Sequence, residues 1–309
     1  MIQKKIKSLI YVGLGLVLCV LLCGGIGMTA QAAETKTYGD FTYEEGKDGI
    51  TITGYTGDKD EVVIPDRIGG TKVTSIGFAA FWDYSGLKSI TLPQSITTIQ
   101  NYAFWGCSSL TDITLPESLT SIGAFVFCNC NGLTSLTIPK NVRSMGYGVF
   151  RNCERLKKVT LSEGITRIAS EAFAGCSSLT SLTIPDGVTS IGRVVFQDCD
   201  KLTSVVIPDS VTEFDTLKEP GFEVLGWSFW EAPNVTIICN KNSAAYKYAK
   251  KNNIPVKLMP KPAKKGTILT VSSKKVKVKV TSSSKKNPTV AVMKITNKKT
   301  KKLTIPSTV

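Results

Sequence analysis

The sequence of 309 residues contains no histidine. Histidine is the commonest general base and metal ligand in proteins, so its absence excludes a Ser–His–Asp or Cys–His catalytic arrangement. A Cys-x-x-Cys pair is also missing, which argues against a zinc site. Neither of the familiar glycine-rich phosphate loops is present. The sequence therefore predicts no catalytic residue, no metal site and no cofactor.

Acidic residues are missing from the first 33 positions. This segment begins with Lys4, Lys5 and Lys7, continues as an apolar run, and ends in Ala30–Ala32 with small residues at the −3 and −1 positions, which is the layout of a cleaved secretory signal peptide. The alternative is an uncleaved anchor, since the run is nearly long enough to span a bilayer. Cleavage would leave no transmembrane segment, so we expect a secreted or cell-surface protein.

Acidic residues are also missing from residues 257–309, which carry 15 lysines, whereas residues 34–256 carry 20 basic and 24 acidic side chains, a net of −4. A dense lysine block attracts polyanions without sequence specificity. For an exported protein we expect an anionic wall polymer rather than nucleic acid, and a solvated basic linker is the alternative. The candidate polyanion contacts are Lys274, Lys275, Lys277, Lys279, Lys298, Lys299, Lys301 and Lys302.

A pattern of apolar residues recurs every 23 positions through the middle of the chain. Leucine recurs at this spacing from Leu87 to Leu202, and phenylalanine recurs from Phe81 to Phe196. Parallel columns contain isoleucine, proline and cysteine, the last of these at Cys107, Cys130, Cys153, Cys176 and Cys199. Many columns in register at a fixed period indicate a solenoid.

Within each repeat, the residue pattern predicts two extended segments and a turn. Ile113 and Leu115 alternate with threonine, which predicts a half-buried strand. Pro116 ends this strand because proline cannot donate a backbone hydrogen bond. A second extended piece reaches Ile122, and the Ala-Phe-x-x-Cys segment returns the chain through a turn or a single helical turn. One coil cannot bury its apolar face alone, but stacked coils bury a continuous core.

The pattern L-x-x-I-x-I-P-x-x-V-x-x-I-G-x-x-A-F-x-x-C resembles the BspA-like leucine-rich repeats of bacterial surface proteins. The resemblance implies a β-rich repeat solenoid over 61–239, a β cap at 34–60, and a short capping helix with a strand at 240–259. Residues 260–309 form a lysine-rich, β-prone tail whose last residues copy the opening strand of a repeat. In similar proteins such a segment introduces another repeat block, so a missing block is one interpretation.

The cysteine column invites two interpretations. Export favours disulfides, and neighbouring coils would bring successive cysteines close enough to pair. However, each cysteine occupies the position where a coil needs one small buried group, and five in a row cannot all pair with neighbours. We therefore predict a ladder of buried free thiols. Cys128 and Cys239 lie outside the column, and the sequence does not explain them.

Aromatic residues outside the core columns are the best candidates for ligand contact. Trp82 and Trp105 occupy one position of adjacent coils, and Tyr102 and Phe125 occupy another close to it. An exposed aromatic group at one end of a rod would suit a protein or glycan ligand, and packing beneath the N-terminal cap or flanking loops is the alternative. The second candidate site is an insertion after Phe214 that contributes Phe222, Trp227 and Trp230.

These observations predict an exported, non-enzymatic protein-binding or adhesion module with a rigid repeat surface. The resemblance implies a partner on a host or neighbouring cell surface. Two alternatives stay open. In one, the array is a structural wall-associated spacer held by its lysine-rich tail. In the other, it is the non-catalytic part of a larger surface enzyme.

Overall fold

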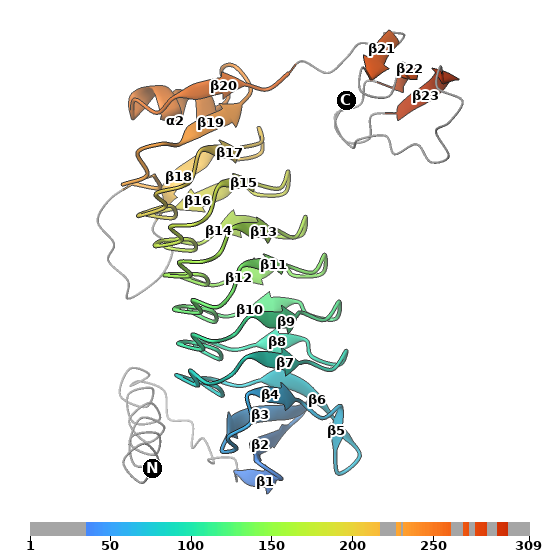
Figure 1. Cartoon of the computed structure of the whole chain (residues 1–309), viewed down its shortest axis with the longest axis vertical. Helices are drawn as coiled ribbons and strands as arrows, with labels where there is room; N and C mark the ends of the chain where they lie inside the picture. The colour runs from blue at the N-terminus through green and yellow to red at the C-terminus, as the bar shows by residue number, and fades with distance from the viewer. Residues whose placement is uncertain are drawn as a thin grey trace.

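The computed structural model describes residues 35–216, 227–229 and 231–260, together with the backbone of three strands further along the chain. The chain winds into a β-solenoid of about nine turns with about 23 residues in each turn (Figure 1). The predicted repeat solenoid is therefore confirmed. The predicted signal peptide, residues 1–33, lies outside the described residues and stays a prediction.

One side of the solenoid is formed by the strand that contains the leucine-rich pattern. In the strands of the repeats the central residue is buried and the outer two are exposed or half-buried, as the alternation with threonine predicts. Neighbouring strands pair in parallel and in register, so that Ile90 lies beside Ile113. The strands of this side are β4 (Glu61–Val63), β7 (Ser89–Thr91), β9 (Asp112–Thr114), β11 (Ser135–Thr137), β13 (Lys158–Thr160), β15 (Ser181–Thr183), β17 (Ser204–Val206), β19 (Thr236–Cys239) and β20 (Val256–Leu258).

A second side is formed by the shorter extended piece of each coil. It carries a column of buried isoleucine and methionine residues that closes with the half-buried Phe214, and its strands also pair in parallel, with Ile99 beside Ile122. The strands of this side are β6 (Thr71–Ile76), β8 (Thr98–Ile99), β10 (Ser121–Ile122), β12 (Ser144–Met145), β14 (Arg167–Ile168), β16 (Ser190–Gly192) and β18 (Glu213–Thr216).

The third side consists of turns, and the Ala-Phe-x-x-Cys segment forms it. Backbone hydrogen bonds join the turns of successive coils, for example from the N–H of Phe81 to the carbonyl oxygen of Ala103 at 2.8 Å. The phenylalanine rings stack inside these turns, with centroids 5.6 Å apart for Phe127 and Phe150. These rings are buried and form the centre of the core.

The cysteine column lies beside the stacked phenylalanines. All five thiols are free and buried. Each one donates a hydrogen bond to the carbonyl oxygen of the phenylalanine in the preceding coil, as Cys153 Sγ does to Phe127 O at 3.0 Å. The thiol therefore satisfies a core carbonyl as well as filling space. Cys128 and Cys239 are free and buried too.

The N-terminal end is covered by an antiparallel unit of β1 (Lys36–Tyr38), β2 (Phe41–Gly46) and β3 (Gly49–Tyr55). Strand β3 also pairs in parallel with β6, which joins the cap to the first coil. The five-residue insertion in this coil is a hairpin between β5 (Arg67–Ile68) and β6. Gly69 and Gly70 form its turn with φ of 56° and 86°, a conformation that favours glycine.

The C-terminal end is covered by helix α2 (Ala244–Lys251), with Ser243 as its N-cap (Figure 1). The ring of Tyr248 stacks on Phe214 with centroids 4.2 Å apart. Asp215 Oδ1 accepts hydrogen bonds from the Tyr248 hydroxyl at 3.0 Å and from Ser228. These contacts attach the predicted capping helix to the last coil.

Further along the chain, β21 (Ile268–Val271), β22 (Val276–Ser282) and β23 (Thr289–Ile295) form a separate antiparallel sheet.

Candidate functional site

Two positions on the turn side carry aromatic residues in adjacent coils. Tyr102 and Phe125 share one position, and Trp82 and Trp105 share another. Tyr102 and Phe125 adopt a left-handed backbone with φ of 60° and 55°. Glu171 occupies the same position two coils beyond Phe125 and has φ of 57°, so this conformation belongs to the coil and not to the aromatic residues.

The structure brings these four side chains together. The rings of Trp82 and Trp105 stack with centroids 4.6 Å apart, and the rings of Tyr102 and Phe125 stack at 5.2 Å. Trp82 also lies 5.3 Å from Tyr102, which joins the two pairs. Each such pair contributes about 0.5–1.5 kcal/mol beyond its buried area. The rings therefore support one another across neighbouring coils.

Two further aromatic residues complete this group, and sequence reasoning missed both. Phe78 meets Tyr102 edge to face at 5.6 Å, and Tyr147 meets Phe125 in the same way at 5.0 Å. The contacting pairs are 24 and 22 residues apart rather than 23, because the partners occupy neighbouring positions of adjacent turns. The aromatic cluster is therefore Phe78, Trp82, Tyr102, Trp105, Phe125 and Tyr147.

The N-terminal part of the aromatic cluster faces solvent. Phe78 is 45% exposed and Trp82 is 41% exposed. Tyr102, Trp105 and Phe125 are half-buried, and Tyr147 is buried. Burial beneath the N-terminal cap therefore does not account for Phe78 and Trp82. Single exposed aromatics are ordinary, but a continuous exposed group is typical of a contact surface.

The other end of the aromatic cluster is polar. The Tyr147 hydroxyl and the Arg151 guanidinium both donate to the carboxylate of Glu171, which is buried. Cys128 follows Trp105 in the same position of the next coil and interacts with the Trp105 side chain through a hydrogen bond. Burial raises the pKa of the Cys128 thiol to about 11, so the thiol is protonated at neutral pH. At this end of the aromatic cluster, hydrogen-bonded polar and charged side chains replace the stacked rings.

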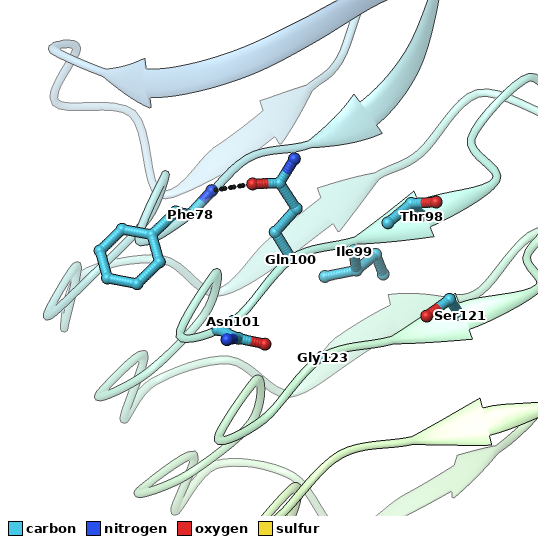
Figure 2. A pocket seen from close by; sticks show the side chains of 7 residues that line it. All are labelled: Phe78, Thr98, Ile99, Gln100, Asn101, Ser121 and Gly123. Atoms are coloured by element: carbon cyan, nitrogen blue, oxygen red, sulfur yellow. Dashed lines mark hydrogen bonds between the residues drawn. The ribbon is translucent and has the colours of Figure 1, made fainter. Parts of the chain in front are cut away.

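A shallow depression of about 260 Å³ adjoins the aromatic cluster between the turns and the second sheet (Figure 2). Phe78, Gln100 and Asn101 are among the residues that line it. The Gln100 side chain reaches back to the first coil, where its Oε1 accepts a hydrogen bond from the Phe78 N–H at 3.0 Å. All the residues that line the depression are uncharged.

The second candidate site is only partly described. Trp227 is half-buried and packs against the core, beside the buried Ser228 and Phe229. The Ser228 hydroxyl donates to the carbonyl oxygen of Gly192 at 2.7 Å, and the ring of Phe229 stacks on Phe196 at 4.9 Å. This segment therefore continues the core columns, and ligand contact by the half-buried Trp227 stays a prediction. Phe222 and Trp230 lie outside the described residues.

The candidate polyanion contacts fall mostly outside the described residues. Lys277 and Lys279 belong to strand β22, of which the backbone is described. The other candidates are not described, namely Lys274, Lys275, Lys298, Lys299, Lys301 and Lys302. An anionic wall polymer as partner therefore stays a prediction.

The part of the chain that the structure describes offers neither a metal site nor a membrane-spanning helix. In this part of the chain, no three histidine, cysteine, aspartate or glutamate side chains gather where a metal ion could bind. Of the helices in the same part, none combines the length and apolar character needed to cross a bilayer.

The geometry defines a repeat solenoid with an aromatic cluster on its turns, and comparison with known proteins identifies the family. The family model of the BspA type leucine rich repeat region matches six copies, over residues 60–179 and 97–217, which together span more than half of the chain. The chain therefore belongs to the BspA-type leucine-rich repeat family. A comparison with curated proteins gave no match.

Several solved structures are similar to this chain. A leucine-rich repeat protein of T. pallidum is 32% identical with a TM-score of 0.53, and the match covers 56% of this chain and 81% of that one. A leucine-rich repeat protein of Eubacterium ventriosum is 26% identical with a TM-score of 0.45, covering 65% and 58%. A leucine rich cell surface protein of Faecalibacterium prausnitzii is 20% identical with a TM-score of 0.33, covering 72% and 98%.

Proposed function

We propose that this chain is an exported, non-enzymatic adhesion module that binds a protein or a glycan on a host or neighbouring cell surface. The ligand contacts the aromatic cluster at the N-terminal end of the rod. The observation that carries the proposal is the exposure of Phe78 and Trp82, at 45% and 41%, above a continuous set of stacked rings. Large aromatic side chains of this kind dominate the binding energy of protein surfaces.

The scaffold beneath the aromatic cluster supports this function because it is rigid. Backbone hydrogen bonds connect adjacent coils on all three sides, including Phe104 N–H to Val126 O at 3.0 Å within the turns. Stacking on Trp105 and Tyr102 restricts the rotamers of Trp82. A ligand therefore meets rings that are already ordered, and binding loses little side-chain entropy.

The test is ligand capture by the full chain and by a double variant, Trp82→Ala with Trp105→Ala. Both are presented to immobilised matrix proteins, purified wall polymers and surface glycans. We expect the double variant to bind its ligand about tenfold more weakly or worse, because two aromatic contacts are lost. The melting temperature should change little, since Trp82 is exposed and Trp105 is half-buried.

The matched control is Tyr246→Ala, which removes a half-buried aromatic ring from helix α2 at the opposite end of the rod (Figure 1). It should capture ligand like the unchanged chain. Equal capture by the double variant would contradict the proposal. A large fall in the melting temperature of the double variant would show instead that these two rings are structural. Capture that disappears in moderate salt would indicate the lysine-rich tail.

A further inference from the structure

The depression beside the aromatic cluster is lined by two amide side chains that backbone hydrogen bonds hold in a fixed orientation. Gln100 Oε1 accepts from the Phe78 N–H at 3.0 Å, and Asn101 Oδ1 accepts from the Ala124 N–H at 2.8 Å. A backbone N–H bonds only to an acceptor, so these two contacts settle which end of each amide is oxygen. The –NH₂ groups of Gln100 and Asn101 therefore point away from these backbone contacts, and both residues are exposed.

The wall of the depression is an aromatic ring with an open face. Trp82, Trp105, Tyr102 and Phe125 stack on one another, so much of their ring faces is covered by neighbouring rings. Phe78 instead meets Tyr102 edge to face, with 70° between the ring planes, and is 45% exposed. Its ring is drawn projecting from the turn beside Gln100 and Asn101 in Figure 2.

The hydroxyl-bearing residues Thr98 and Ser121 line the same depression, from strands β8 and β10. The Ser121 hydroxyl shares a hydrogen bond with Ser144 at 3.1 Å. Because every lining residue is uncharged, the site offers no countercharge for a phosphate, a sulfate or an ammonium group. The combination is one aromatic face, two amide donors and two hydroxyls around about 260 Å³.

We propose that this depression binds a pyranose unit of a neutral or N-acetylated glycan. The C–H groups on one face of the sugar would pack on the Phe78 ring, because the electron-rich ring face attracts weakly positive hydrogens. Hydroxyl or acetamido oxygens would accept from the amides of Gln100 and Asn101. The inference rests on the proposed adhesion function and names its ligand class. Adjacent sugars would then lie over the remaining rings of the aromatic cluster.

The test uses isosteric substitutions that preserve the fold contacts. In Gln100→Glu and Asn101→Asp a carboxylate oxygen still accepts from the Phe78 or Ala124 N–H, but the outward –NH₂ donor becomes an acceptor. The matched control is Gln94→Glu, which makes the same charge change at an exposed residue outside the depression. Phe78→Ala removes the ring itself.

Binding of the full chain to an array of neutral and N-acetylated oligosaccharides is measured first, and the affinity for the best of them is then determined by calorimetry. We expect about tenfold or greater loss of affinity in Phe78→Ala and in each of Gln100→Glu and Asn101→Asp. Gln94→Glu should bind like the unchanged chain.

Two results would overturn the inference. One is an array on which no oligosaccharide binds, and the other is glycan binding that these three variants leave unchanged. If a protein ligand is captured through Trp82 and Trp105 while no glycan binds, the adhesion function stands and the glycan inference falls. If neither proteins nor glycans are captured, both fall.

Discussion

The buried thiol column makes the stability of the solenoid sensitive to alkaline pH. Cys107, Cys130, Cys153, Cys176 and Cys199 have no exposed surface, and burial raises the pKa of every one of these thiols, in Cys199 to about 12. An unfolded cysteine has a pKa of about 8.5. Below about pH 8.5 the thiols are mostly protonated in both the folded and the unfolded chain, so little stability is lost.

As the pH rises above about 8.5, the unfolded chain releases protons that the folded chain retains, so folding becomes less favourable. At about pH 9.5 each buried thiol should cost about 1.4 kcal/mol, and the five together about 7 kcal/mol. A loss of this size is comparable to the whole stability of an ordinary domain, about 5–15 kcal/mol.

The assay is urea unfolding followed by circular dichroism at about pH 7.5 and about pH 9.5. The comparison is with a double variant, Cys153→Ala with Cys176→Ala. This variant is less stable at both pH values because it loses two buried groups, but its pH-dependent loss should be smaller by about 2–3 kcal/mol. An equal loss in both proteins would refute the explanation, because groups other than the thiols would then be responsible.

Two further predictions concern the core and the ionic network. Phe150→Ala should lower the free energy of unfolding by about 3–5 kcal/mol, since Phe150 is fully buried and stacks on Phe127 and Phe173; urea unfolding measures this, and a loss no larger than that of the exposed control Thr160→Ala would contradict it. Glu171→Gln should cost about 1–3 kcal/mol because the buried carboxylate accepts from Tyr147 and Arg151; an unchanged thermal midpoint would show that this network contributes nothing.

The regular part of the fold could be predicted because each coil buries the same kinds of residue at the same positions. Ile113 and Phe127 lie where the 23-residue columns place them, on a strand and inside a turn. The free thiols followed from the same regularity, since the position of Cys153 admits only a small buried group. Their hydrogen bonds to phenylalanine carbonyls could not be predicted, because they depend on the stagger between coils.

The candidate site was predictable only where two aromatics share a column. Trp82 with Trp105, and Tyr102 with Phe125, follow this rule and do stack. Phe78 lies in a column whose next member is Asn101, so nothing in a strict 23-residue alignment connects it to Tyr102. The contact depends on the direction in which the side chains of adjacent turns project, and only the folded coil sets that direction.

The parallel strands on two sides and the hydrogen-bonded turns on the third also affect how such a protein can change in evolution. Because each coil bonds only to the coils beside it, recombination within the repeats can delete or duplicate a whole coil while the new neighbours meet the same backbone and the same buried columns. Each event changes the reach of the rod by about 4.8 Å and leaves the aromatic end as it was. Length and recognition can therefore be selected separately, one through the number of coils and the other through a few side chains on the first turns.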